Sequence, residues 1–404
     1  MTPPHAGSMS AAAPVSRRDD RIDFLRGIAL LVIFIDHVPK NWFEPFTLHA
    51  FAFSDAAEVF FFISGYVAAM VYGRAMLKKG FVPAAKKVWR RAGVVYGAQL
   101  LLLVAVVMLS GIFLAATGDE NFRWIFRVYW VFEHPLPYIL PALTLHYQPA
   151  YSDILPCYVL LLAVFPLVLK GFTRSAWLVL VPSFGLWLAA QFGLNLWTST
   201  GDRWFFNPFA WQLLFVLGAL FGHPSLKGRL AFLVDSPWAF WGAVAFAGMA
   251  AVVQLSETVS QFVPAVPSLH PAWLPLDKTA LSALRLLSFL ALAMVVRRML
   301  PPVGALSRNA SALAVIRCGR SSLQVFTFGV LLSSAAVVSL ILSGDNKLVQ
   351  SMVCVAGLGA QFAYAAWRDQ RRENVAADQA LAPVMVRAKP TVRPPPDNPL
   401  DRNI

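Results

Sequence analysis

The chain has little charge for its length. Only 14% of its 404 residues are charged and 58% are hydrophobic, whereas about a quarter of the residues in an average soluble domain carry a charge. This composition excludes an ordinary soluble domain and predicts an all-α, polytopic membrane protein. The net charge of +13 does not indicate a nucleic-acid partner, because the basic residues form short clusters between apolar runs, as cytoplasmic loops do.

The sequence also lacks the motifs of several enzyme classes. It contains no G-x-S-x-G, P-loop, Rossmann fingerprint or H-E-x-x-H, so hydrolase, NTPase, dehydrogenase and zinc-protease functions have no support. The three cysteines, Cys157, Cys318 and Cys354, lie singly with no C-x-x-C spacing, which indicates neither a disulfide framework nor a zinc site. We therefore expect no bound metal and no bound cofactor.

Apolar runs of near-membrane length fill most of the chain and predict about ten transmembrane helices. The runs cover residues 22–38, 52–74, 88–116, 151–170, 175–197, 209–222, 237–255, 280–296, 321–342 and 348–366. An even number of spans puts both termini on one side of the membrane. The other side carries few basic residues, namely Lys40, Arg123, Arg127, Arg203, Lys278 and Lys347. By the positive-inside rule, both termini are expected in the cytoplasm.

The two ends of the chain differ in composition from its apolar middle. Residues 1–20 are rich in Ala, Pro and Ser, and residues 368–404 are polar and end in a Pro-rich segment. Both segments are too poor in apolar residues to build a core, so we expect them to be disordered cytoplasmic tails. The membrane domain is expected to span residues 21–367.

The first apolar run carries ionisable residues at both ends. Arg26 and His37 are eleven residues apart, which places them on one stripe of a helix, about 16 Å apart along its axis, with Leu30 and Ile33 between them. Ionisable groups in a membrane span seldom face lipid, so the stripe is typical of a cavity lining. The alternative is that Arg26 anchors the span in the cytoplasm and His37 is a hydrogen-bonded interfacial residue.

This spacing and the residues around it resemble a known family. An Arg, ten residues and a His on the first membrane helix resembles the signature of the membrane acyltransferase-3 superfamily. The segments 23–27, 36–39 and 54–65 look like the OpgC branch, the succinyltransferases of osmoregulated periplasmic glucans. The match is strong over about residues 20–75 and weaker beyond them.

The resemblance implies an O-acyltransferase of the bacterial inner membrane. Its donor would be a cytoplasmic acyl-CoA such as succinyl-CoA, and its acceptor a hydroxyl of a periplasmic glucan or another carbohydrate. His37 has the pKa suited to removing the proton of that hydroxyl, and Arg26 would hold a donor phosphate or an acyl carboxylate. The other partner is membrane lipid.

Two carboxylates at the start of the second run are further candidates. Asp55 and Glu58 share a helix face, and Glu58 is our choice for the carboxylate that orients His37. The alternative is that Ser54 or Asp55 caps the helix and that both acids favour its dipole. Asp36 points about 100° away from His37 and ranks below Glu58. Asp23, one turn before Arg26, is expected to form an ion pair.

The remaining candidates rest on position alone. Basic residues that a phosphorylated donor would require are Arg90, Arg91 and Arg320, with Arg285, which lies inside a late span, as a further cation. Residues near the opposite side that an acceptor sugar would contact are Asp153, Tyr151, Asn207, Trp211 and Gln212. For each of these, topology, anchoring or helix capping is the alternative.

A transporter is the rival function, because intramembrane ionisable residues also form proton relays and substrate paths. Here the ionisable groups concentrate in the first two spans and no inverted repeat is evident, which favours the enzyme.

The orientation predicts the result of reporter fusions. A reporter fused after Asp345 should be active in the periplasm, and one fused after Gln370 should be active in the cytoplasm, because an even number of spans separates the termini. Paired alkaline phosphatase and fluorescent protein fusions measure this. A cytoplasmic signal at Asp345 would overturn the expectation of about ten spans.

Overall fold

The computed structural model describes residues 19–226, 228, 231–271, 273–344 and 346–387. Within these ranges every element is helical, apart from an isolated bridge between Trp197 and Arg203. The prediction of an all-α protein is therefore confirmed. Residues 1–18, which make up most of the expected N-terminal tail, lie outside the described residues.

Each of the ten apolar runs contains a helix. These helices are α1 (Asp20–Asp36), α2 (Ala56–Ala68), α4 (Phe81–Thr117), α8 (Ile154–Arg174), α9 (Trp177–Gln191), α10 (Pro208–Gly222), α12 (Pro237–Phe262), α13 (Ala283–Met299), α15 (Ser322–Leu342) and α16 (Lys347–Arg387). Short helices connect them: η1 (Glu44–Phe46), η2 (Leu48–Ala50), η3 (Ala69–Gly73), α3 (Arg74–Lys79), α5 (Asn121–Ile125), α6 (Tyr129–Glu133), α7 (Pro135–Leu143), α11 (Ala231–Asp235), η4 (Leu306–Arg308) and α14 (Ala310–Arg320).

Six helical segments of the described chain are long and apolar enough to cross a membrane. They are Ala56–Lys79, Phe81–Thr117, Ile154–Arg174, Pro237–Phe262, Ser322–Leu342 and Lys347–Val375. The helices of the other four runs have only 15 to 17 residues, fewer than the roughly 20 of a typical span. The protein is thus a multi-pass helical protein with six candidate spans, and the number of about ten stays a prediction.

Capping residues account for where several helices begin. Asp19 accepts a hydrogen bond from the backbone N–H of Arg21 at the start of α1. Asn207 and Ser236 cap α10 and α12 in the same way, and each is followed by a proline at the first helical position, where a missing N–H costs nothing. Local sequence therefore sets these boundaries.

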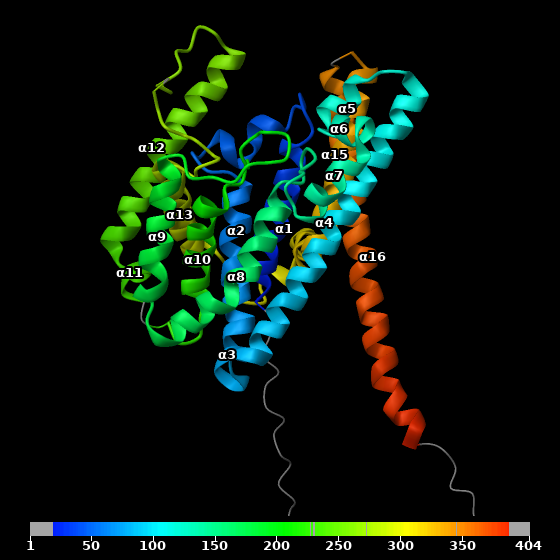
Figure 1. Cartoon of the computed structure of the whole chain (residues 1–404). Helices are drawn as coiled ribbons and strands as arrows, with labels where there is room; N and C mark the ends of the chain where they lie inside the picture. Colours follow the sequence, from blue (N-terminus) through cyan, green and yellow to red (C-terminus); the bar gives the residue numbers. More distant parts are fainter. Residues whose placement is uncertain (1–18, 227, 229–230, 272, 345, 388–404) are drawn as a thin grey trace, which may run out of the picture.

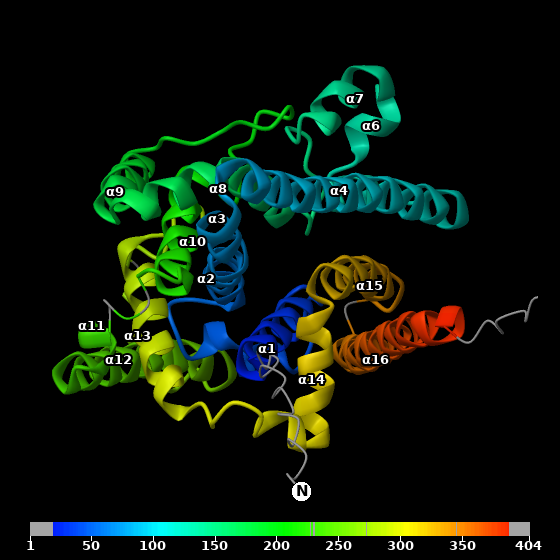
Figure 2. The same ribbon diagram turned by 90° about the horizontal axis from the view of Figure 1, so that it is seen from below.

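The helices form one bundle around α1, α2, α8 and α10. Helix α1 packs on α2, α14 and α15, and α2 packs on α10, which contacts α8 and α9. Helices α12 and α13 lie together at one edge and α15 and α16 at the other (Figures 1 and 2). Figure 1 shows the start of α1 and the end of α16 on the same side of the bundle. An even number of crossings predicts this arrangement.

Glycines bring the central helix pairs into backbone contact. A side chain at Gly218 or Gly222 of α10 would overlap the carbonyl oxygen of Phe62 or Tyr66 in α2, and one at Gly65 would overlap that of Phe215. Gly218 and Gly222 are four residues apart, the spacing of the small-xxx-small motif of membrane helices. Gly27 of α1 and Gly319 of α14 meet in the same manner. These contacts set the close spacing of the central helices.

Helix α16 extends beyond the predicted end of the domain. It runs to Arg387, although the sequence predicted a disordered tail from residue 368. The reason is that residues 368–382 contain no proline and include four Ala, three Arg and two Gln, which are strong helix formers. The Pro-rich end, residues 388–404, lies outside the described residues.

The glycine contacts predict a stability difference. Gly218→Ala should lower the free energy of unfolding by about 1–3 kcal/mol, the usual cost of overpacking, because its methyl group meets the Phe62 carbonyl. Gly97→Ala in α4 is the matched control, since its methyl group has open space. Thermal unfolding in detergent measures both, and equal unfolding temperatures would contradict the tight α2–α10 contact.

Candidate functional site

His37 lies at the end of α1, on the side of the bundle opposite the chain ends. It is the C-cap of α1 and keeps a helical backbone, so the predicted alignment with Arg26 on one stripe holds. The ring is half-buried, and its centroid lies 4.8 Å from that of Tyr151. Tyr151 adopts φ of +63°, a left-handed conformation that non-glycine residues seldom hold unless their surroundings fix it.

A small pocket lies between α1 and α15 and reaches His37. It has about 10 Å³ of open space, close to what one water molecule needs, and is lined by Leu30, Ile33, Phe34, His37, Val325, Phe326, Gly329 and Val330. His37 is its one ionisable lining residue. Leu30 and Ile33, the residues between Arg26 and His37 on the predicted stripe, line the same pocket, whereas Arg26 is not part of the lining. The part of the stripe from Leu30 to His37 therefore faces this cavity, and a cavity lined by Arg26 as well stays a prediction.

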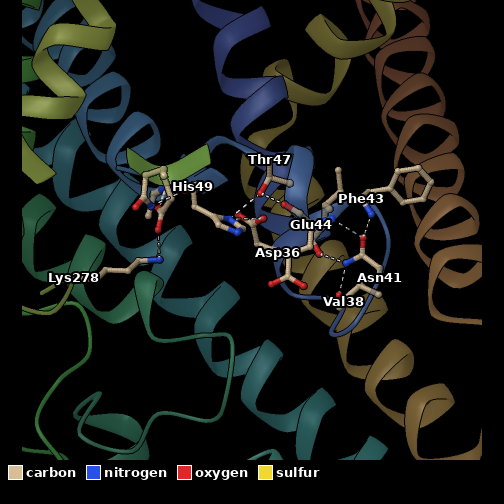
Figure 3. Close-up of polar contacts among 12 residues, drawn as sticks. Asp36, Val38, Asn41, Phe43, Glu44, Thr47, His49 and Lys278 are labelled. Atoms are coloured by element: carbon tan, nitrogen blue, oxygen red, sulfur yellow. Dashed lines mark hydrogen bonds and ion pairs between the residues drawn. The ribbon is translucent and has the colours of Figure 1, made fainter. Parts of the chain in front are cut away.

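The turn after α1 is held by Asn41 (Figure 3). Its side-chain N–H groups donate to the carbonyls of Ile35 and Val38, at 3.0 and 2.5 Å. Its side-chain oxygen accepts from the backbone N–H groups of Phe43 and Glu44. These four bonds fix the segment that directly follows His37. No sequence pattern singles out Asn41, because its partners are backbone atoms.

Two carboxylates and two cations form a buried cluster beside α2. Asp55 and Glu58 make a capping box at the start of α2. Arg285 of α13 lies 2.6 Å from Glu58 and 3.1 Å from Asp55, and the Lys278 ammonium lies 2.6 Å from Asp55. Glu58 is fully buried. We call Asp55, Glu58, Lys278 and Arg285 the charge cluster.

The predicted pairing of Glu58 with His37 is not what the structure contains. Glu58 accepts hydrogen bonds from the backbone N–H of Asp55 and from Nε of Arg285, at 2.9 and 2.8 Å. Both oxygens are thus engaged, because a buried carboxylate is stabilised most by a guanidinium and a backbone donor. The capping role that the sequence also indicated is present in the structure. Arg285 is occupied by the same contacts, which leaves it poorly placed to meet a donor.

Asp36 and Asp23 also have partners other than the catalytic candidates. Asp36 lies 3.5 Å from Nδ1 of His49 in η2, and this carboxylate raises the pKa of His49 above its ordinary value. Asp23 lies 4.0 Å from Nε of Arg320 in α14, and the ion pair predicted with Arg26, one turn along α1, stays a prediction. Neither carboxylate is placed to orient His37.

Three of the predicted acceptor-binding residues serve packing instead. Asn207 caps α10 and donates to the Leu194 carbonyl. Trp211 is fully buried and donates to the Lys278 carbonyl. Gln212 exchanges hydrogen bonds with Ser183. The polar atoms of these three side chains form hydrogen bonds inside the bundle. Their partners include backbone carbonyls, which require a donor when they are buried.

Tyr151 is the acceptor candidate that the structure brings against His37. Tyr151 contacts the His37 ring, and Asp153 is half-buried two residues later, just before α8. Burial raises the pKa of Asp153, against the opposing charges of Arg127 and Lys278. The Lys278 ammonium lies 2.6 Å from Asp55 at the start of α2. We call this side of the bundle the mouth and describe it by five residues: His37, Asp55, Tyr151, Asp153 and Lys278.

The donor-binding candidates lie on the side of the chain ends. Arg90 is exposed and Arg91 half-buried, near the start of the long helix α4. Arg320 lies 3.3 Å from Asp369 of α16, which it shares with Arg317. Arg26 is half-buried in the first half of α1. The structure thus separates the basic side from the mouth by most of the length of α1.

Within the part of the chain that the structure describes, no group of three or more His, Cys, Asp or Glu side chains is arranged to hold a metal ion.

The charge cluster predicts the effect of a conservative change. Glu58→Gln should lower the free energy of unfolding by about 1–3 kcal/mol, because glutamine has one acceptor oxygen where Glu58 uses two, and its NH₂ group faces another donor. Glu44→Gln, in η1, is the control. A different result would contradict this. If Glu58→Gln keeps its unfolding temperature but its catalytic rate falls by about 10²–10⁴, the range of one acid–base group, Glu58 acts by orienting His37.

The comparison with known protein families agrees with the resemblance seen in the first two spans. A family model described as OpgC protein matches residues 18–373, which covers most of the 404 residues. The searches of curated proteins and of solved structures found no match. From the extent of the family match, we conclude that the chain belongs to the OpgC family.

Proposed function

We propose that the protein is an O-acyltransferase that moves a succinyl or other short acyl group from cytoplasmic acyl-CoA to hydroxyls of periplasmic glucans. The observation that carries the proposal is the position of His37, between Tyr151 at the mouth and an apolar pocket inside the bundle. Family membership supports acyl transfer as the reaction type.

His37 supplies the general base. A sugar hydroxyl is a poor nucleophile until its proton is removed, and an imidazole is the side chain with the nearest suitable pKa. In the proposed step, His37 takes the hydroxyl proton while the oxygen attacks the thioester carbonyl. The carbon–sulfur bond then breaks, and the proton returns to the departing thiolate. A transient acyl-imidazole on His37 is the alternative route to the same products.

The cavity beside His37 has only about 10 Å³ of open space, about what one water molecule needs. We therefore propose that the acyl group meets His37 at the mouth and not inside this cavity. Arg26, about 16 Å from His37 along α1, is the proposed contact for a donor phosphate or carboxylate on the side from which the donor enters.

The proposed topology has about ten spans with both termini in the cytoplasm of a bacterium, and the protein in its inner membrane. The four short helices α1, α9, α10 and α13 complete the ten, and α1 and α10 each pack on several neighbouring helices. The clustering of basic residues near the chain ends supports this orientation. It puts the mouth in the periplasm, where the glucan acceptor is found.

Acyl transfer by the purified protein tests the proposal. Full-length protein in detergent should transfer radiolabelled succinyl groups from succinyl-CoA to a periplasmic glucan, a reaction that a transporter cannot perform without two compartments. His37→Gln should abolish this transfer, because glutamine keeps a hydrogen bond but has no basic nitrogen. His134→Gln, at an exposed position after α6, is the control and should retain activity.

Substantial transfer by His37→Gln would make His37 structural. Absence of transfer by the wild-type protein, with succinyl-CoA and with other short acyl-CoA donors, would overturn the proposed reaction itself.

A further inference from the structure

Lys278 sits on a loop that the surrounding helices hold firmly. The loop joins α12 to α13, and three side chains of α9 and α10 donate hydrogen bonds to its carbonyls: Trp211 to Lys278 at 3.1 Å, Gln191 to Ala280 at 2.7 Å and Trp187 to Leu281 at 2.9 Å. Leu281 is fully buried with φ of +48°, a conformation that persists only when its surroundings impose it. The backbone of Lys278 is thus fixed from inside the bundle.

The side chain of Lys278 points toward the end of α1. Its ammonium lies 2.6 Å from Asp55 and within 5.6 and 5.8 Å of the Phe205 and Phe206 ring centres. Figure 3 shows it directed toward the segment that carries Asp36 and His49. A cation is therefore directed toward the end of α1 that carries the proposed base.

Lys278 is the accessible cation of the charge cluster. Its side chain is 31% exposed, whereas that of Arg285 is 11% exposed. An ammonium has three N–H donors, and Asp55 takes one of them. Arg285 instead directs Nε to Glu58 and a terminal nitrogen to both carboxylates. A ligand anion at the mouth would therefore meet Lys278 rather than Arg285.

We propose that Lys278 binds the free carboxylate of the acyl group while His37 acts at the ester-forming end. This inference rests on the proposed function and narrows its donor to acyl groups that end in a second carboxylate. The adjacent aromatic rings exclude water from one side of the ammonium, which strengthens its attraction for an anion. A neutral acyl group of the same length makes no such contact, so the site discriminates by charge.

The test compares two donors that differ only in charge. Succinyl-CoA and butyryl-CoA both carry four-carbon acyl groups, but only the first ends in a carboxylate. With purified full-length protein, Lys278→Gln should reduce the succinyl-to-butyryl ratio of kcat/KM by about ten- to hundredfold, the contribution of one charge-assisted hydrogen bond. In Lys278→Gln, the glutamine keeps an N–H donor for Asp55. Lys278→Arg keeps the positive charge and should therefore retain most of the preference for succinyl-CoA over butyryl-CoA.

Lys347→Gln is the matched control, since Lys347 is exposed at the start of α16, and it should leave the ratio unchanged. Unfolding temperatures of all variants check folding. If Lys278→Gln does not fold, the succinyl-to-butyryl ratio of kcat/KM is compared between the wild type and Lys278→Arg instead. A wild type with no preference for succinyl-CoA rejects the inference.

If Lys278→Gln lowers kcat/KM equally for both donors, the inference is overturned, although the proposed acyl transfer is not. A wild type that transfers neither group would reject the proposed function, and this inference with it.

Discussion

The buried charge cluster is the constraint on which the arrangement of the mouth depends. Burying an unpaired charge costs several kcal/mol, so Asp55 and Glu58 are stable inside the bundle only with Arg285 and Lys278 beside them. This requirement ties the start of α2 to α13 and to the loop before it. The cluster thus fixes the three segments that surround the end of α1, where His37 lies.

Close backbone packing supplies the complementary constraint. Glycines let α2 approach α10, and α1 approach α14, until backbone atoms touch. In a membrane, where lipid is as apolar as leucine, such van der Waals contact is a main source of helix association. The two constraints act on different features. The glycine contacts set the spacing of the central helices, and the charge cluster sets how the start of α2 and α13 are placed relative to each other at the mouth.

The proposed reaction places different demands on the two ends of α1. At the mouth, His37 needs an acceptor surface, and Tyr151 lies against it. Toward the chain ends, a donor needs cations, and Arg26, Arg90 and Arg91 lie on that side. This separation is what transfer across a membrane requires.

The sequence by itself determined the membrane class, the helical fold, the positions of ten apolar helices and the stripe that carries Arg26 and His37. These follow from composition, run length and helical period, which are properties of neighbouring residues. Only the tertiary structure decided the partners. Glu58 pairs with Arg285, 227 positions later, and not with His37. Lys278 is one of the residues of the mouth. The polar atoms of three predicted acceptor-binding residues form hydrogen bonds inside the bundle: Asn207, Trp211 and Gln212. Contacts between distant segments depend on how the helices pack, and no local pattern encodes that choice.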